Sequence, residues 1–208
     1  MINITKSFHG VRANDNISLS VSAGEILGLL GENGAGKTTL MNILYGIYQP
    51  DGGEIRINDN RVLIDSPRAS IEHGIGMVHQ HFKLVNNLSA AENIVLGLEG
   101  KGRLDRKKIS AKVRQISERY GFNINPERKI YDMSVSEKQT VEIIKVLYRG
   151  ANILILDEPT AVLTTQEADK LFAILRSMRD DGKSIIIITH KLQEVLDISD
   201  RVTVLRKG

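Results

Sequence analysis

The chain carries the segment Gly31-Glu32-Asn33-Gly34-Ala35-Gly36-Lys37-Thr38, followed directly by Thr39. This segment matches the phosphate-loop pattern G-x-x-x-x-G-K-[ST] at every fixed position. The apolar run at 25–30 predicts a buried strand before it, and residues 38–45 predict a helix after it. A strand that delivers a glycine-rich loop to a helix is the context in which this pattern binds phosphate.

The chemistry of the loop also suits phosphate. Its glycines, at positions 31, 34 and 36, let the backbone curl so that successive N–H groups converge, and the helix N-terminus adds positive potential there. Lys37 would reach the terminal phosphates as a point charge, and the Thr38 hydroxyl would take one position on Mg²⁺. An ordinary glycine-rich turn is the alternative. With strand, lysine and threonine in register, we expect a nucleoside triphosphate as the ligand.

Size and composition indicate an ordinary globular protein. The 208 residues suit one domain, or one domain with a small appendage. Hydrophobic residues make up 41% and charged residues 25%, and no apolar run has the length that crosses a bilayer. The N-terminus lacks the order of a signal peptide, so we expect the chain to stay in the cytosol unless a partner holds it at a membrane. The absence of cysteine excludes disulfides, thiolate metal sites and cysteine nucleophiles.

The net charge of +3 raises the question of a nucleic-acid partner. The basic residues are spread along the chain, and their densest group contains no aromatic residue. That group consists of Lys101, Arg103, Arg106, Lys107, Lys108, Lys112 and Arg114. It falls on one predicted helix and its approach, so a solvated helix face explains it better than a binding surface, and we expect no nucleic-acid partner.

The N-terminal part of the chain predicts strands. Residues 2–5 and 17–21 alternate between apolar and polar side chains and predict a pair of strands around a polar turn. Past the phosphate loop, residues 54–58 predict a return strand. A short helix is expected to begin at Pro67, ahead of a strand at 75–78.

From about residue 88 to residue 149 the pattern changes to helices only. A capping box at Ser89 opens one helix, and two more are predicted at 106–120 and 136–148. Strands and helices then alternate again. The expected strands are 152–156, 184–189 and 202–205, and the expected helices are 165–180 and 191–198.

These patterns together predict an α/β fold. Continuous apolar strands between helices indicate a largely parallel sheet that is buried on both faces. We expect one nucleotide-binding domain over 1–208, with a P-loop NTPase core at about 1–87 and 150–208. The core would carry an antiparallel β subdomain, and the helical subdomain would be inserted at about 88–149.

A second motif, which is acidic, follows the strand at 153–156. Asp157 and Glu158 come directly after it, where the carboxyl end of a parallel strand would bring them beside the phosphate loop. Asp157 would hold Mg²⁺ through water, and Glu158 would point toward the γ-phosphate and polarise an attacking water. A solvated turn is the alternative, and the phosphate loop upstream argues against it.

The order of motifs resembles one family. A phosphate loop, Gln80, the segment 132–139, the run Leu-Asp-Glu-Pro-Thr at 156–160 and His190 follow each other as in the ATP-binding cassette family, the ATPase subunits of ABC transporters. Three segments are most similar to the first cassette of uptake ATPases for sugars and nucleosides that carry two cassettes in one polypeptide. These segments are 76–82, 91–94 and 158–164. By that likeness the chain is expected to be an N-terminal half, truncated at its C-terminus.

The resemblance assigns roles to single residues. It implies that Phe8 stacks on adenine, that Gln80 offers its amide oxygen to Mg²⁺ while sensing a membrane partner, and that His190 contacts the γ-phosphate and orients the water. The catalytic residues would then be Lys37, Glu158 and His190, and the metal ligands Thr38, Gln80 and Asp157. The implied nucleotide contacts are Phe8, Gly31, Glu32, Asn33, Gly34, Ala35, Gly36, Lys37, Thr38, Thr39, Gln80 and Ser134.

Ser134 has a different implied role. The family's signature segment caps the γ-phosphate bound by a second cassette that packs head to tail, and Ser134 would donate its hydroxyl there. The sequence departs from the family pattern around this position: Ser136, Glu137 and Thr140 stand where glycine, glutamine and arginine are usual. Thr164 likewise replaces an aspartate that communicates across the interface.

The resemblance implies an ATPase subunit that couples ATP hydrolysis to the uptake of a sugar or nucleoside-like solute. Its expected partners are a second cassette, transmembrane permease subunits and, indirectly, a solute-binding protein. We expect a peripheral location at the cytoplasmic face of the membrane. Two alternatives stay open: an ATP-binding cassette ATPase that transports nothing, and a half that binds ATP at a degenerate composite site.

Overall fold

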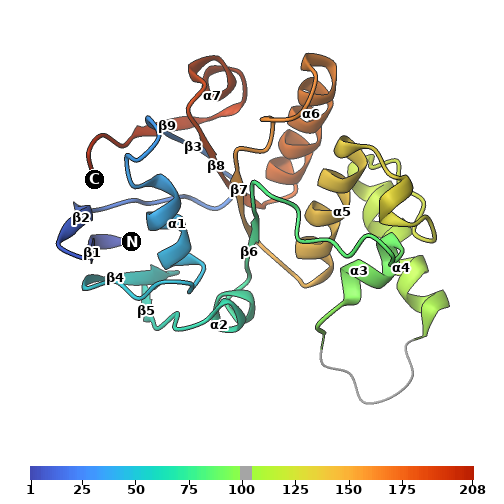
Figure 1. Ribbon diagram of the computed structural model, residues 1–208, viewed down its shortest axis with the longest axis horizontal. Helices are drawn as coiled ribbons and strands as arrows, with labels where there is room; N and C mark the ends of the chain where they lie inside the picture. The colour runs from blue at the N-terminus through green and yellow to red at the C-terminus, as the bar shows by residue number, and fades with distance from the viewer. Residues whose placement is uncertain (99–104) are drawn as a thin grey trace.

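The structure is a computed structural model that describes residues 1–98 and 105–208 (Figure 1). Its strands are β1 Ile2–Phe8, β2 Val11–Ile17, β3 Ile26–Leu30, β4 Gly52–Ile57, β5 Asn60–Val62, β6 Ile75–Val78, β7 Ile153–Asp157, β8 Ser184–Thr189 and β9 Arg201–Val204. Its helices are α1 Lys37–Leu44, α2 Pro67–Glu72, α3 Ala90–Val95, α4 Arg106–Tyr120, α5 Val135–Tyr148, α6 Thr165–Asp180 and α7 Leu192–Ile198, with the 3₁₀ helix η1 at Ile130–Asp132. In this part of the chain no helix is both long and apolar enough to cross a membrane.

A parallel sheet forms the centre of the core. Its strands lie in the order β6-β7-β8-β3-β9, and each neighbouring pair is parallel. Alternate residues of β8 face opposite sides: Ile185 and Ile187 join one buried cluster, which contains residues of α5 and α6. Ile186 and Ile188 join the other, which contains residues of α1. Helices therefore cover both faces, which explains why these strands are apolar throughout.

The antiparallel sheet has the order β2-β1-β4-β5, and the expected strand at 17–21 is wrong. The partner of β1 is residues 11–17, with Phe8 opposite Val11. The turn lies at His9 and Gly10, whose φ values of 47° and 84° are those of the tight two-residue hairpin turn that suits strand twist. Because β2 is an edge strand whose polar side chains, apart from Asn14, are exposed, its sequence lacks the alternation that marks a half-buried strand.

Helices α3, α4 and α5 and the 3₁₀ helix η1 follow one another between β6 and β7, and we call this group of helices the helical lobe. The predicted capping box at Ser89 is present, and α4 spans the predicted residues and ends at Gly121, whose φ of 75° suits a glycine C-cap. The α/β fold class, with its parallel sheet, antiparallel sheet and helices, is thus confirmed.

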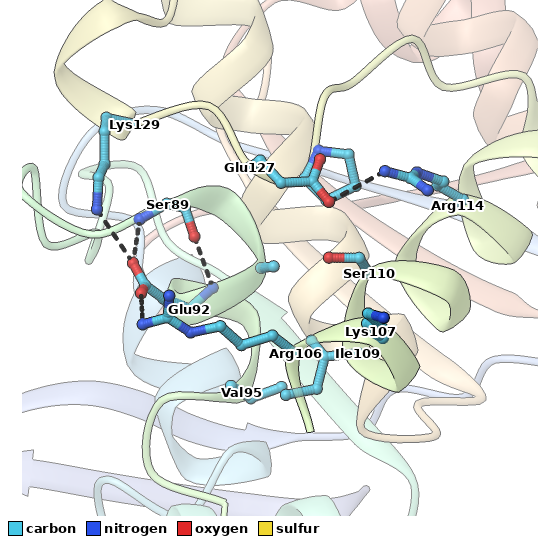
Figure 2. A pocket seen from close by; sticks show the side chains of 12 residues that line it. Ser89, Glu92, Val95, Arg106, Lys107, Ile109, Ser110, Arg114, Glu127 and Lys129 are labelled. Carbon is cyan, nitrogen blue, oxygen red and sulfur yellow. Dashed lines mark hydrogen bonds and ion pairs between the residues drawn. The ribbon is translucent and has the colours of Figure 1, made fainter. Parts of the chain in front are cut away.

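The described members of the basic group lie exposed on α4. Arg106 pairs with Glu92 of α3, and Arg114 pairs with Glu127 in the loop before η1 (Figure 2). Ion pairs between exposed side chains such as these are typical of a solvated helix face. They contribute little stability. Two further members of the predicted group, Lys101 and Arg103, lie outside the described residues.

Candidate functional site

The chain topology brings the chemistry-bearing residues to one edge of the parallel sheet. The phosphate loop follows β3, Glu158 follows β7, and His190 follows β8, and these three strands are neighbours in the sheet. Gln80 comes two residues after β6, the strand beside β7, and its side chain is exposed. The carboxyl edge of such a sheet is where open α/β folds bind ligands.

The phosphate loop is held by close backbone contacts that only glycine allows. Gly36 caps α1 with φ 96°, and a Cβ atom there would lie 2.3 Å from the carbonyl oxygen of Ala13. A Cβ atom on Gly31 would lie 2.4 Å from the carbonyl oxygen of Leu205. Asn14 of β2 donates from Nδ2 to the Gly36 carbonyl at 3.2 Å. The β1–β2 hairpin and the end of β9 therefore fix the shape of the loop.

Lys37 lies inside this loop. Its side chain is buried, and Nζ donates to the carbonyl oxygens of Gly31 at 2.6 Å and Glu32 at 2.9 Å. The ammonium group thus lies where the loop backbone and the start of α1 converge, which is the arrangement that attracts a phosphate group. Thr38 and Thr39 follow in the first turn of α1, with Thr38 exposed.

Asp157 is the buried carboxyl of the site. Burial raises its pKa, and the neighbouring Glu158 raises it further, whereas Lys37 and a hydrogen bond from the Thr38 hydroxyl oppose the rise. Two oxygen groups that suit Mg²⁺, those of Asp157 and Thr38, therefore lie together. Among the described residues no three His, Asp or Glu side chains form a metal-binding group. Mg²⁺ would consequently need oxygens from phosphate or water as well, and the residues present fit that mode.

Glu158 and His190 form a direct pair. Nδ1 of His190 lies 2.7 Å from Oε1 of Glu158, although 32 positions separate them in the chain. The backbone of Glu158 has φ 49°, and its N–H donates to the Ile188 carbonyl at 2.9 Å. A glutamate rarely adopts such a backbone conformation, and observed strain of this kind clusters at functional sites.

The loop and His190 line one hollow of about 640 Å³, which also includes Leu192 and Val204. Gly31, Glu32, Asn33, Gly34 and Ala35 are the loop residues that face it.

Sequence reasoning missed two supporting residues. Asn14 is one, because the sequence predicted no strand at its position. Glu194 is the other: it accepts hydrogen bonds from Thr160 and from Thr189, at 3.1 Å in the latter case, and pairs with Lys191 at 2.8 Å. It therefore fixes the residues on both sides of His190.

Phe8 and Ser134 do not lie at the carboxyl edge of the parallel sheet. Phe8 ends β1 and packs edge-on against Tyr48, with ring centroids 5.0 Å apart and the Lys6 ammonium 5.5 Å from its ring. Ser134 caps α5 in the helical lobe, where its Oγ accepts from the Glu137 N–H at 3.2 Å.

Comparison with known proteins gives a consistent result. The sequence model of the family described as ABC transporter matches residues 14–161. The chain is 58% identical over its whole length to a guanosine import ATP-binding protein, NupO, of Bacillus subtilis. It is also 48% identical over its whole length to a glucose import ATP-binding protein, TsgD13, of Haloferax volcanii. It spans 41% and 43% of these two relatives, respectively.

A solved structure agrees with these relatives. The dimeric structure of a bacterial ABC transporter cassette superposes with a TM-score of 0.85 at 26% identity. The match covers all of this chain and 94% of that one.

Proposed function

Because this chain belongs to the ABC transporter family, we propose that it is a nucleotide-binding cassette that binds ATP with Mg²⁺ and hydrolyses it to drive the import of a solute. The buried ammonium of Lys37 inside the phosphate loop is the single observation that carries this proposal. A charged group is retained in such a place only when it is paired, and its partners are two loop carbonyls that a phosphate group can supplement.

Each side chain at the sheet edge has a distinct task. Lys37 and the loop N–H groups hold the terminal phosphates and offset the negative charge that grows during transfer. Thr38, Asp157 and Gln80 supply oxygens for Mg²⁺, which when bound neutralises phosphate charge. The Glu158 carboxylate accepts a proton from a water molecule that attacks in line, and His190 orients that carboxylate through Nδ1. Away from this edge, Phe8 at the end of β1 stacks on the base.

The difference in exposure between the two carboxyl side chains supports this division of tasks. Asp157 is buried beside Lys37, whereas the side chain of Glu158 is 14% exposed and its carboxylate contacts His190, whose side chain is 44% exposed. Glu158 is therefore the carboxylate that water can reach, and Asp157 the one that is fixed in place.

We further propose that residues 1–208 act as one nucleotide-binding domain, with the core at about 1–87 and 150–208 and the helical lobe at about 88–149. A second cassette would pack head to tail, so that Ser134 faces the nucleotide of that partner. The dimeric cassette structure supports a two-cassette assembly. Membrane permease subunits would hold the chain at the cytoplasmic face of the membrane, and a solute-binding protein would act indirectly.

A nucleoside is the solute that the relatives favour, since the relative named for guanosine import is more similar than the one named for glucose import. Uptake of radiolabelled guanosine and glucose by vesicles that contain the assembled transporter would decide between them. Uptake of neither solute would contradict this assignment.

The test of the cassette itself is direct. Calorimetry should show binding of ATP in the presence of Mg²⁺, and turnover in the two-cassette assembly should require Glu158. If no affinity for ATP is found, the proposed function is wrong.

A second candidate function is that of one half of a two-cassette protein. This half would bind ATP itself but contribute poorly to the site that holds the nucleotide of the partner cassette. The hydrogen bonds that already occupy Ser134 favour it. Both cassettes would then bind ATP, and turnover would be confined to one of the two composite sites.

A further inference from the structure

The four residues that follow β9 lie directly against the phosphate loop. Leu205 is buried, and its N–H donates to the carbonyl of Leu30, the last residue of β3, at 2.8 Å. The Gly208 N–H donates to the Ala35 carbonyl at 3.2 Å, and the Gly208 carbonyl accepts from the Asp15 N–H of β2 at 2.7 Å (Figure 1). This segment is therefore held at one end by the strand that delivers the loop and at the other by the loop itself and by β2.

Between these two attachments lie two cationic residues, Arg206 and Lys207. Both side chains are exposed. Both residues line the hollow of about 640 Å³ that the phosphate loop and His190 also line. Among the described residues that line this hollow, the single acidic side chain is that of Glu32. Positive charge therefore exceeds negative charge on its wall, even when His190 is neutral.

Neither cation is neutralised by a neighbouring side chain. With the residues that the structure describes, the side chains of Arg206 and Lys207 form no ion pair and no hydrogen bond. Lys191, the cation next to His190 in the chain, by contrast pairs with Glu194 at 2.8 Å. Two unpaired positive charges beside a loop whose N–H groups converge add to the potential that attracts an anion.

The backbone of Lys207 also points to a role at this site. Its φ is 55°, in the left-handed region that a lysine rarely adopts. An exposed lysine needs no such conformation to reach solvent, and observed strain of this kind clusters at functional sites. The two hydrogen bonds of Gly208, to the loop and from β2, hold the turn in which Lys207 lies.

We propose that Arg206 and Lys207 form a cationic arm of the nucleotide site, which attracts the terminal phosphate of ATP toward the phosphate loop and His190. This inference rests on the proposed function. The end of a triphosphate carries its highest density of negative charge, and the proposed γ-phosphate contact, His190, lies on the wall of the same hollow. Because the arm acts from an exposed position, each charge contributes modestly, and its contribution weakens as salt rises.

The variants change the charge and leave the backbone as it is. Arg206→Gln and Lys207→Asn each remove one positive charge, and asparagine is chosen at position 207 because it tolerates a positive φ better than most residues. Lys207→Arg keeps both the charge and the backbone demand, so it should keep the wild-type affinity. Arg61→Gln is the matched control: it also removes one charge, but Arg61 is 74% exposed on β5, in the antiparallel sheet.

The experiment is calorimetry on the assembled transporter with Mg²⁺, using ADP and AMP-PNP, a non-hydrolysable analogue of ATP. We expect Arg206→Gln and Lys207→Asn each to weaken AMP-PNP binding by about two- to fivefold at low salt. The loss should be smaller for ADP, which has one phosphate fewer, and it should shrink at high salt. Arg61→Gln should bind both nucleotides like the wild type, and thermal unfolding checks that each variant is folded.

Three results would overturn the cationic arm: wild-type affinity in both neutralised variants, equal losses for AMP-PNP and ADP, or a loss that Lys207→Arg or Arg61→Gln reproduces. A wild-type transporter that binds AMP-PNP with an affinity independent of Arg206 and Lys207 contradicts only the arm. A wild-type transporter with no affinity for AMP-PNP or ATP contradicts the proposed function itself.

Discussion

Nδ1 of His190 lies 2.7 Å from Oε1 of Glu158, and the two residues enter the site from neighbouring strands, β8 and β7. Since a carboxylate accepts, Nδ1 is the protonated ring nitrogen when the histidine is neutral. Nε2 is then an acceptor that can face a water molecule or a donor on the ligand. The pair therefore fixes both the orientation of the Glu158 carboxylate and the tautomer of His190.

Glu158→Gln should abolish turnover without abolishing ATP binding. The amide keeps the size and the contact with His190 but cannot take a proton, so we expect kcat to fall by roughly 10²–10⁴-fold. Calorimetry on the same variant should give a dissociation constant close to that of the wild type. Turnover that survives the change would show that another group activates the water.

His190→Ala should lower turnover because it leaves the Glu158 carboxylate free to rotate. Misplacement of a catalytic group by about 1 Å can cost roughly 10²-fold, and we expect a loss of that size in kcat with little change in thermal stability, since His190 is exposed. His190→Gln, which can still donate to Glu158, serves as the control and should recover part of the rate. Equal losses in both variants would argue against an orienting role.

Two glycines of the loop offer a matched comparison. Gly36→Ala brings a Cβ atom to 2.3 Å from the Ala13 carbonyl oxygen, whereas Gly34→Ala meets no atom within 4 Å; their φ values are 96° and 82°. The left-handed conformation costs an alanine about 1–2 kcal/mol at either position. Gly36→Ala should lose more than Gly34→Ala in the free energy of unfolding by denaturant, because only it displaces β2. Equal losses would mean that the hairpin does not constrain the loop.

Much of this arrangement follows from the sequence, and the exceptions have physical causes. The apolar run at 184–189 and the caps of α4 specify their elements locally, so the predicted bounds agree with the structure. β2 could not be predicted, because its polar residues are held by pairing with β1. The contact of Asn14 with the phosphate loop was missed for the same reason. The family pattern, in turn, indicated that Ser136 was unusual but not that it touches Ser134.

Asp157→Asn should stabilise the folded chain in the absence of ligand while it weakens Mg²⁺ binding. The folded-state pKa of Asp157 is raised above its ordinary value of 3.8, chiefly by burial. Folding therefore favours the protonated carboxyl, and stability is lost as the pH rises through the folded-state pKa. The variant should unfold at a higher temperature than the wild type at pH 7, and the gap should narrow toward pH 4. A gap that is independent of pH would show that the carboxyl carries no such penalty.

Lys37→Met should weaken nucleotide binding through the loss of one buried charge. Methionine fills most of the volume of the lysine stem but leaves the carbonyl oxygens of Gly31 and Glu32 without their donor. The variant also loses the hydrogen bond from the ammonium to a phosphate of ATP. Hydrogen bonds to charged groups are worth about 1.5–3 kcal/mol, which corresponds to a loss of ATP affinity of roughly 10- to 100-fold.

Lys108→Met is the control, because Lys108 is 87% exposed on α4 and its loss should leave affinity unchanged. Calorimetry with ATP and Mg²⁺ measures both variants, and thermal unfolding shows whether each is folded. An affinity retained by folded Lys37→Met would mean that the ammonium inside the loop serves the fold alone, and that the phosphates are held by the loop N–H groups and the start of α1.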